Sequence, residues 1–495
     1  MKLIENALVV TMDPAHKIYD RGDIVIDDGR IAYVGPAGRA PYARAGYSEI
    51  VDASSQIVMP GLINSHSHSQ SAFTKLAGSG DRTNVITALW YGFAHGLNRS
   101  LRDIHVGTLL HAIQLLKSGC TCVIDQFRFY GLPESDEIEQ AATAYQKSGM
   151  RALVAFDMRD RPNTTLLPKE VKDIPQSALD MMQAREMTFD DQVALYRAAA
   201  GQWNADAAGL VKVIPTTGSP LGCSDKLLMT IIELAEEYDT ATTSHILEHP
   251  KDRRSAAAMW DKPLLEHLAD VGYLSERLCI AHAIWVEEDE IELLARHGAS
   301  VAHNPELNLR LGGGRALIRS MMNAGVNLSL GADSATSQNI FEVMKITGLI
   351  HRLGKPNPSD WIYADELIRM ATIDGARSLR LADKVGSLEP GKDADLLFLN
   401  LNSPWLTPLN DLPSRLVYFE NGAGIDRVMV KGEVVMENGE ILTFDERSVV
   451  EEARELGAAL YERNQDFYRL ASQMSEILKP EIQALEAEAY ERRKI

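Results

Sequence analysis

Two histidines separated by one residue, His66 and His68, follow the largely apolar residues 57–63. Side chains two positions apart on a strand point to the same side, so both imidazoles can face one point. Two neutral imidazoles directed at one point form half of a metal site. The chain has 13 histidines, and such a pair also occurs by chance. A metal site therefore requires further ligands elsewhere in the chain.

Residues that bind metals or transfer protons end four further apolar runs. The runs at 241–245, 278–282 and 300–303 end in His245, His282 and His303, and Asp333 follows the run at 327–331. In a parallel βα barrel the chemistry lies at the carboxyl ends of the strands. Repetition at the same structural position favours one shared site over unrelated histidines.

The region that must position these residues, 60–387, alternates short apolar runs with amphipathic segments such as 104–117 and 287–297. Further candidate strands lie at 122–125, 151–156 and 210–215, which with the strand of His66 makes eight. Eight strands alternating with helices predict a distorted (β/α)8 TIM barrel of the α/β class.

Both ends of the chain are rich in short strands. Residues 7–12 and 23–35 near one end, and 394–399 and 428–435 near the other, read as strands and hairpins, with Asp28-Gly29 and Lys431-Gly432 as turns. We expect residues 1–59 and 388–446 to form one small β-sandwich domain. The charged, helix-prone tail, residues 447–495, is expected to cap the barrel or contact a neighbouring subunit.

Composition excludes several classes of protein. The 495 residues are 45% hydrophobic and 24% charged, as in folded soluble proteins. The chain has no long apolar run for a membrane span or a signal peptide, so we expect a cytoplasmic protein without a membrane partner. The net charge of −19 argues against nucleic acid as a partner. Four scattered cysteines predict small buried residues rather than disulfides or a zinc knuckle.

The motifs resemble the mononuclear aminohydrolase branch of the amidohydrolase superfamily, to about residue 445. That branch contains cytosine, guanine and S-adenosylhomocysteine deaminases and s-triazine hydrolases, and the chain is most similar in pattern to atrazine chlorohydrolase and melamine deaminase. The matching motifs are PGLINSHSH at 60–68, HILE at 245–248, AH at 281–282, HNPELN at 303–308, GAD at 331–333, MATIDGARSL at 370–379 and GSLEPGKDAD at 386–395.

The resemblance implies one divalent metal, Zn²⁺ or alternatively Fe²⁺, which lowers the pKa of a bound water. The implied ligands are His66, His68, His245 and Asp333. Asp333 would also accept the proton of the water, Glu248 would carry it to the substrate, and His282 would hydrogen-bond the water or the developing oxyanion. The expected reaction is hydrolytic deamination of a small heterocycle, such as a pyrimidine, purine base, pterin or s-triazine, by metal-bound hydroxide.

Substrate contacts are expected from Gln70, His303 and Asn308, and from Ser334 and Ser337 near the leaving group. Aromatic residues after strand ends, Trp90 first among them, could stack on a flat ring, although core packing explains them equally well. The others are Tyr91, Phe93, Phe127 and Trp285. The segment 215–220 lacks the histidine that relatives acting on adenosine-type thioethers usually carry there, which argues against an adenosine-containing substrate. Residues 158–195, with Met181, Met182 and Met187, form either a lid or a packing helix.

Three alternatives stay open. The leaving group could be chloride, an alkylamine or a thioalkyl group instead of ammonia. A binuclear cyclic-amide hydrolase would need a carboxylated lysine, but Lys212 lies well before the end of its strand. A scaffold that has lost catalysis is disfavoured because all the ligand positions are filled. The resemblance alone implies a homo-oligomer, a dimer or larger.

Overall fold

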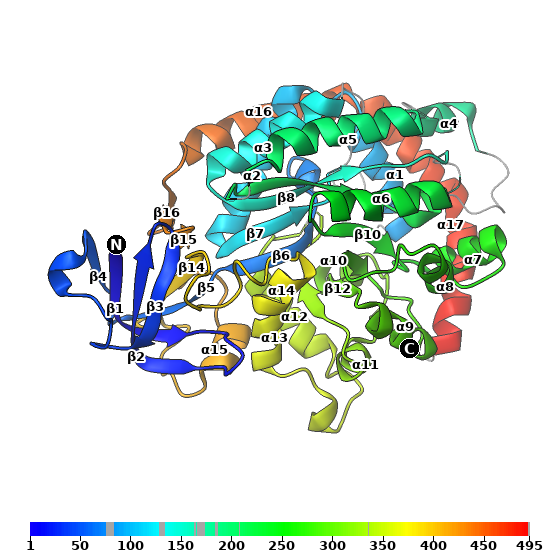
Figure 1. The fold of residues 1–495 in the computed structure, drawn as a ribbon. Coiled ribbons are helices and arrows are strands. Elements are labelled where there is room, and N and C mark those ends of the chain that lie inside the picture. Colours follow the sequence, from blue (N-terminus) through cyan, green and yellow to red (C-terminus); the bar gives the residue numbers. More distant parts are fainter. Residues whose placement is uncertain are drawn as a thin grey trace.

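A small β-rich unit joins a larger α/β body, which a long C-terminal helix crosses (Figure 1). The computed structural model describes residues 1–75, 84–127, 134–162, 165, 174–183, 187–206, 208–334 and 336–493.

The small unit contains strands from both ends of the chain, as predicted. They form one nine-stranded sheet in which β5 pairs with β1 from the N-terminal part and with β14 from the C-terminal part. The Asp28-Gly29 and Lys431-Gly432 turns have the positive φ angles of tight hairpins. The strands are β1 (Lys2–Val10), β2 (Ile18–Asp27), β3 (Arg30–Pro36), β4 (Glu49–Asp52), β5 (Gln56–Pro60), β14 (Leu396–Asn400), β15 (Ile425–Val430), β16 (Glu433–Glu437) and β17 (Glu440–Ile441).

The larger body is a distorted barrel made of two parallel four-stranded sheets. One has the order β6 (Leu62–Ser67), β7 (Cys120–Asp125), β8 (Arg151–Asp157), β9 (Val211–Thr216); the other has β10 (Thr242–Ile246), β11 (Leu278–His282), β12 (Ser300–His303), β13 (Leu328–Leu330). At one seam, the amide of Asp333 donates to the carbonyl of His66 over 2.9 Å. At the other seam, the amide of His245 donates to the carbonyl of Gly218 over 3.3 Å. All eight predicted strands are present.

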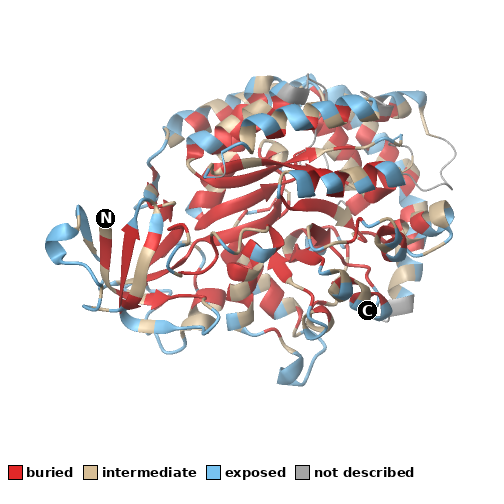
Figure 2. Ribbon diagram, in the orientation of Figure 1, coloured by how far each residue is buried: buried red, intermediate tan, exposed pale blue. Residues whose placement is uncertain are grey.

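The barrel strands are buried on both faces because helices surround them (Figure 2). Local signals set several helix boundaries. Ser100 and Asp103 form a capping box at the start of α2, and Gly298, at a φ of 69°, ends α9. The helices around the barrel are α1 (Val85–Gly96), α2 (Leu101–Lys117), α3 (Glu134–Ser148), α4 (Gln176–Gln183), α5 (Phe189–Trp203), α6 (Asp225–Glu237), α7 (Pro250–Trp260), α8 (Leu264–Asp270), α9 (Glu288–His297), α10 (Pro305–Arg310), α11 (Ile318–Asn323), α12 (Ile340–Ile350), α13 (Ala364–Met370) and α14 (Ile373–Ser378); α15 (Leu412–Tyr418) follows β14.

The C-terminal tail forms two helices, α16 (Glu446–Arg463) and α17 (Gln465–Arg493), and α17 packs against α1, α4 and α7. The tail thus lies against helices of the barrel region, and its expected contact with a neighbouring subunit stays a prediction. Trp90 of α1 and Met182 of α4 are buried in the apolar cluster beneath α17. The packing interpretation of the 158–195 insertion therefore fits its described part, whereas 163–164, 166–173 and 184–186 lie outside the described residues.

The cysteines Cys120, Cys122, Cys223 and Cys279 are all buried and unpaired, as predicted, and burial raises the pKa of each thiol. Within the described ranges, none of the helices has the length and apolar character needed to cross a membrane.

Candidate active site

The predicted metal ligands meet at the carboxyl ends of the barrel strands. His66 lies near the end of β6 and His68 directly follows this strand, His245 lies near the end of β10, and Asp333 follows β13. The Nε2 atoms of His68 and His245 are 3.2 Å apart. Oδ1 of Asp333 lies 3.4 Å from Nε2 of His68 and 3.7 Å from Nε2 of His66. Five strand-end positions thus contribute to one cluster, since His282 also joins it.

Backbone carbonyls fix the orientation of two of these imidazoles. Nδ1 of His68 donates to the carbonyl of Gln126, and Nδ1 of His245 to the carbonyl of Gly218, each over 2.8 Å. Each ring therefore carries its hydrogen on Nδ1 and turns the lone pair of Nε2 toward the cluster, as in metal-binding histidines. Three imidazoles and a carboxylate fit Zn²⁺ or Fe²⁺.

His282, at the end of β11, connects the cluster with Glu248. Its Nε2 lies 3.3 Å from Oδ2 of Asp333 and 3.7 Å from Oε1 of Glu248, and its Nδ1 bonds Oδ1 of Asn308 over 2.8 Å. Burial alone would lower the pKa of His282, but the Glu248 and Asp333 carboxylates and Asn308 outweigh it, so the pKa is raised. Burial raises the pKa of Asp333 to about 6, although the nearby His282 opposes this.

The backbone is unusual at three of the loops that carry these groups. Leu247, His282 and Asp333 have φ angles of 53°, 77° and 62°, in the left-handed region that side chains other than glycine seldom adopt. Such conformations cost free energy and gather where function requires a particular side-chain direction.

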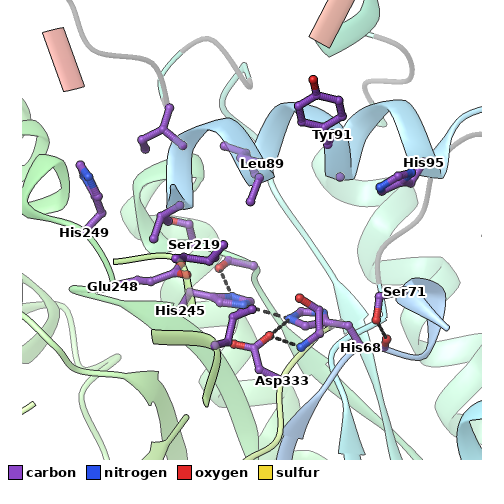
Figure 3. Close-up of a pocket in the computed structure, with 18 of the residues that line it drawn as sticks. His68, Ser71, Leu89, Tyr91, His95, Ser219, His245, Glu248, His249 and Asp333 are labelled. Carbon is purple, nitrogen blue, oxygen red and sulfur yellow. Dashed lines mark hydrogen bonds and ion pairs between the residues drawn. The ribbon is translucent and has the colours of Figure 1, made fainter. Parts of the chain in front are cut away.

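A cavity opens above the cluster. The helix α1 forms its opposite wall, where Leu89 and His95 lie on the side of the ligands His68 and Asp333 and the Tyr91 ring is directed away from them (Figure 3). Glu248 lies at the cavity edge beside His245. A flat substrate can therefore lie between α1 and the metal ligands.

The structure places some predicted substrate contacts at the cavity and others elsewhere. Gln70 and Ser334 line it, and so does Tyr91. Asn308 is buried behind His282 and orients that ring instead of lining the cavity.

Three predicted contacts lie away from the cavity wall. Trp90 packs in the core under α17, so the core-packing alternative describes it. His303 is buried, and its Nε2 lies 3.1 Å from Nε2 of His351. Ser337 is exposed and bonds Glu306. The strand-end position of His303 fixes where its backbone lies but not which way its side chain is directed.

The cavity also contains residues that the strand-end pattern could not identify. His95 and Arg99 come from α1 and the segment after it, and His249 and Lys251 from the start of α7. His95 lies in a largely apolar helix, which gives no sequence signal for a binding residue. His249 directly follows the HILE motif and could have been found by extending that motif.

Only one metal cluster is formed by the described residues: both groups of clustered ligands include His66. Lys212, the lysine that a binuclear relative would need, is directed elsewhere. Its Nζ donates to the carbonyls of Asn204 and Asp206. The geometry therefore does not favour the binuclear alternative.

Comparison with known proteins identifies the family. The model of the amidohydrolase family matches residues 57–435, more than half of the chain. The chain belongs to the amidohydrolase family. The expected enzyme class is thereby confirmed, and the matched region begins and ends in strands of the small β domain.

Similar proteins include deaminases of two kinds. The chain is 29% identical to the 5′-deoxyadenosine deaminase of Methanosarcina mazei, over 93% of this chain and 98% of that protein. It is 30% identical to the 5-methylthioadenosine/S-adenosylhomocysteine deaminase of Pyrococcus furiosus, over 91% and 98%.

Solved structures show the same fold. An adenosine deaminase from Xanthomonas campestris with bound zinc matches at a TM-score of 0.80 and 25% identity, over 93% of this chain and 98% of that one. The atrazine chlorohydrolase of Arthrobacter aurescens, complexed with zinc, matches at a TM-score of 0.80 and 26% identity, over 92% of this chain and 100% of that one. Both of these solved structures hold zinc.

Proposed function

We propose that this amidohydrolase deaminates an amino-substituted nitrogen heterocycle hydrolytically, with one divalent metal held by His66, His68, His245 and Asp333. The observation that carries the proposal is the combined cluster: inward-facing imidazoles, a buried carboxylate, and Glu248 within reach of His282 at the edge of the cavity. Zn²⁺ is the metal we expect, because similar structures hold zinc.

The bound metal would supply Lewis acidity, which makes water a nucleophile near neutral pH. Glu248 lies between the cluster and the open cavity, so it can receive a proton and deliver it to a ring nitrogen and then to the departing amine. Asn308 occupies Nδ1 of His282, which leaves Nε2 of His282 to hold the reacting oxygen. Leu89 and Leu307 in the cavity wall supply apolar surface for a flat ring.

Two observations bear differently on the substrate. Relatives at 29–30% identity deaminate 5′-deoxyadenosine or methylthioadenosine and S-adenosylhomocysteine. In this chain, by contrast, Gly218 and Ser219 line the cavity after β9, where adenosine-type enzymes usually have a histidine. We therefore propose a substrate whose ring is purine-like but whose substituent differs from that of an adenosine thioether.

The decisive experiment is a screen for ammonia release, with metal analysis on the same preparation. The candidates are 5′-deoxyadenosine, methylthioadenosine, guanine, cytosine, amino-substituted pterins and melamine, each tested with zinc-loaded protein. Turnover of one ring with about one metal per chain supports the proposal. Two metals per chain, or turnover only of cyclic amides, would overturn it.

One observation supports chloride as an alternative leaving group. Ser334 lies beside Asp333 in the cavity wall, and the similar atrazine chlorohydrolase acts on a chlorinated ring. The same screen should therefore include atrazine, with chloride detection. Release of chloride but no ammonia would favour the dehalogenating alternative.

Assembly and location are also proposals. We propose a cytoplasmic homo-oligomer, a dimer or larger, and light scattering coupled to gel filtration tests the assembly. A monomer at micromolar concentration would contradict it.

A further inference from the structure

His95 lines the cavity on α1 and has no part in the proposed reaction. Its side chain is only 8% exposed, yet it belongs to the wall opposite the metal ligands (Figure 3). Among the described residues, its Nε2 has no hydrogen-bond partner. A buried polar atom without a partner costs free energy, so this nitrogen gains from a group that binds in the cavity.

The C-terminal helix fixes the other nitrogen of this ring. Nδ1 of His95 lies 2.7 Å from Oη of Tyr468 in α17, and the two rings meet edge to face at 5.1 Å. Burial, together with the nearby Arg99 cation, lowers the pKa of His95 to about 3, so the ring is neutral at physiological pH.

The neutral ring carries one hydrogen, and Tyr468 determines where. Within the described residues, the hydroxyl of Tyr468 makes no hydrogen bond other than the one with His95. A buried hydroxyl donates its hydrogen where it can, so Tyr468 donates to Nδ1 and the hydrogen of the ring lies on Nε2. The N–H at Nε2 is therefore the unpartnered donor of a ring that lines the cavity.

The neighbours of His95 favour the same kind of ligand atom. Arg99, a permanent cation, also lines this part of the cavity and donates to the carbonyl of Gln70. The side-chain amide of Gln70 also lines the cavity and adds an acceptor, Oε1, to the donors of His95 and Arg99. A donor-rich region suits an oxygen atom on the ligand better than an alkyl group.

We propose that His95, positioned by Tyr468, donates a hydrogen bond to an oxygen on a substituent of the substrate ring. The C-terminal helix thereby takes part in substrate selection. This inference rests on the proposed function, because it assumes that the ring reacts at the metal cluster. It names a specificity-determining residue, His95, and a positioning residue, Tyr468.

The kinetic test compares two substrates with one ring. For a purine these are 5′-deoxyadenosine, whose substituent carries oxygens, and 9-ethyladenine, whose substituent carries none. If the screen identifies another ring, the two substrates are the hydroxyalkyl and the alkyl derivative of that ring. The change His95→Phe should lower kcat/KM about tenfold for the oxygen-bearing substrate, through KM, and change it less than about twofold for the other. His95→Gln, which keeps an N–H, should recover part of the loss.

The test of Tyr468 has a matched control. Tyr461 stacks near Tyr468 at 4.8 Å and is 42% exposed. Tyr468→Phe should weaken only the oxygen-bearing substrate, by about threefold, because the ring loses its fixed tautomer. Tyr461→Phe should change neither substrate. Equal losses on both substrates in either His95→Phe or Tyr468→Phe would overturn the proposal.

A second measurement is independent of turnover, so that failure of the proposed function can be recognised separately. Nitrogen-15 spectra of histidine-labelled protein, with the His95→Gln variant used to assign the signal, report the protonation of His95. We expect a neutral ring with its hydrogen on Nε2 at pH 7 and a changed tautomer balance in Tyr468→Phe. A hydrogen on Nδ1 in the unmodified protein would overturn the proposal, whatever the screen shows.

Discussion

At the scale of single residues, hydrogen bonds behind each imidazole decide what the ring offers to the site. The carbonyls of Gln126 and Gly218 take the Nδ1 hydrogens of His68 and His245, so their Nε2 atoms face the metal position. In His95 the tautomer that we propose is the opposite one: the hydroxyl of Tyr468 lies at Nδ1, and the hydrogen of the ring is on Nε2. Identical side chains thus become metal ligands in one place and a donor in another.

Glu248 is the residue whose removal should separate chemistry from metal binding. Glu248→Gln keeps the shape of the side chain but not its proton transfer, so kcat should fall about 10²–10⁴-fold. Metal content should be unchanged, since Glu248 is not a ligand. Steady-state kinetics and metal analysis check both, with the exposed Glu292→Gln as control. Retained activity would refute the assigned role.

Gly331 allows β13 to approach the first metal ligand. A Cβ at this position would collide with Oδ1 of Asn304 and lie 2.8 Å from Cβ of His66. Gly331→Ala should therefore weaken metal binding about 10–100-fold by displacing His66. Gly201→Ala is the control, because a Cβ there meets nothing within 4 Å. Metal titration measures the affinity of both variants. Equal metal affinities in Gly331→Ala and Gly201→Ala would show that His66 does not move.

The strand-end pattern predicted the ligands well because it depends on backbone position. His66, His68, His245, His282 and Asp333 all lie at or within three residues of a strand end, and they converge. The pattern predicted substrate contacts poorly, because side-chain direction or the packing of a distant helix determines which residues reach the cavity. Ser337 is directed to solvent, Trp90 to the core, and His95 reaches the cavity only because α1 and α17 pack together.

At the scale of elements, the seam between β6 and β13 carries most of the site. One bridge, Ser67 to Asp333, joins the strands, and ligands lie on both sides of it. The eight strands were predictable from apolar runs between helices. The predicted barrel implies a seam between the first and last strands, but the register of that seam leaves no local sequence signal.

Removal of the metal should loosen this seam first. At metal concentrations 100 times Kd, binding to the folded state contributes about 2.7 kcal/mol, which a chelator withdraws. Hydrogen exchange should then increase at the amide of Asp333 and in β6, while β1 and β2 of the small domain stay protected. Uniform change over both domains would argue against a local effect, and added zinc should reverse it.

At the scale of the whole molecule, a buried ion cluster joins the barrel to the small domain. Arg151 at the start of β8 donates to Asp393 over 2.8 Å and to Asp395 over 3.1 Å, just before β14. Burial disfavours the charged guanidinium, but the two carboxylates raise its pKa. Loss of either side of the cluster would leave buried charge without its counter-charge.

Arg151→Met should lower the free energy of unfolding by about 3–5 kcal/mol, because it leaves two carboxylates without their cation. Urea unfolding followed by fluorescence measures it. Arg197→Met is the control: Arg197 pairs with Glu237 at the surface, so little change is expected. A loss no larger than the control would show that the cluster is not a stabilising link.

The bridge between Ser67 and Asp333 also has a consequence for synthesis. The first ligand pair leaves the ribosome long before Asp333, which follows the last barrel strand. A nascent chain that stops before Asp333 holds histidines without their carboxylate and without the seam that aligns them. High-affinity zinc uptake should therefore mark the completion of the barrel, and a ribosome-bound chain ending before residue 328 should take up zinc only weakly.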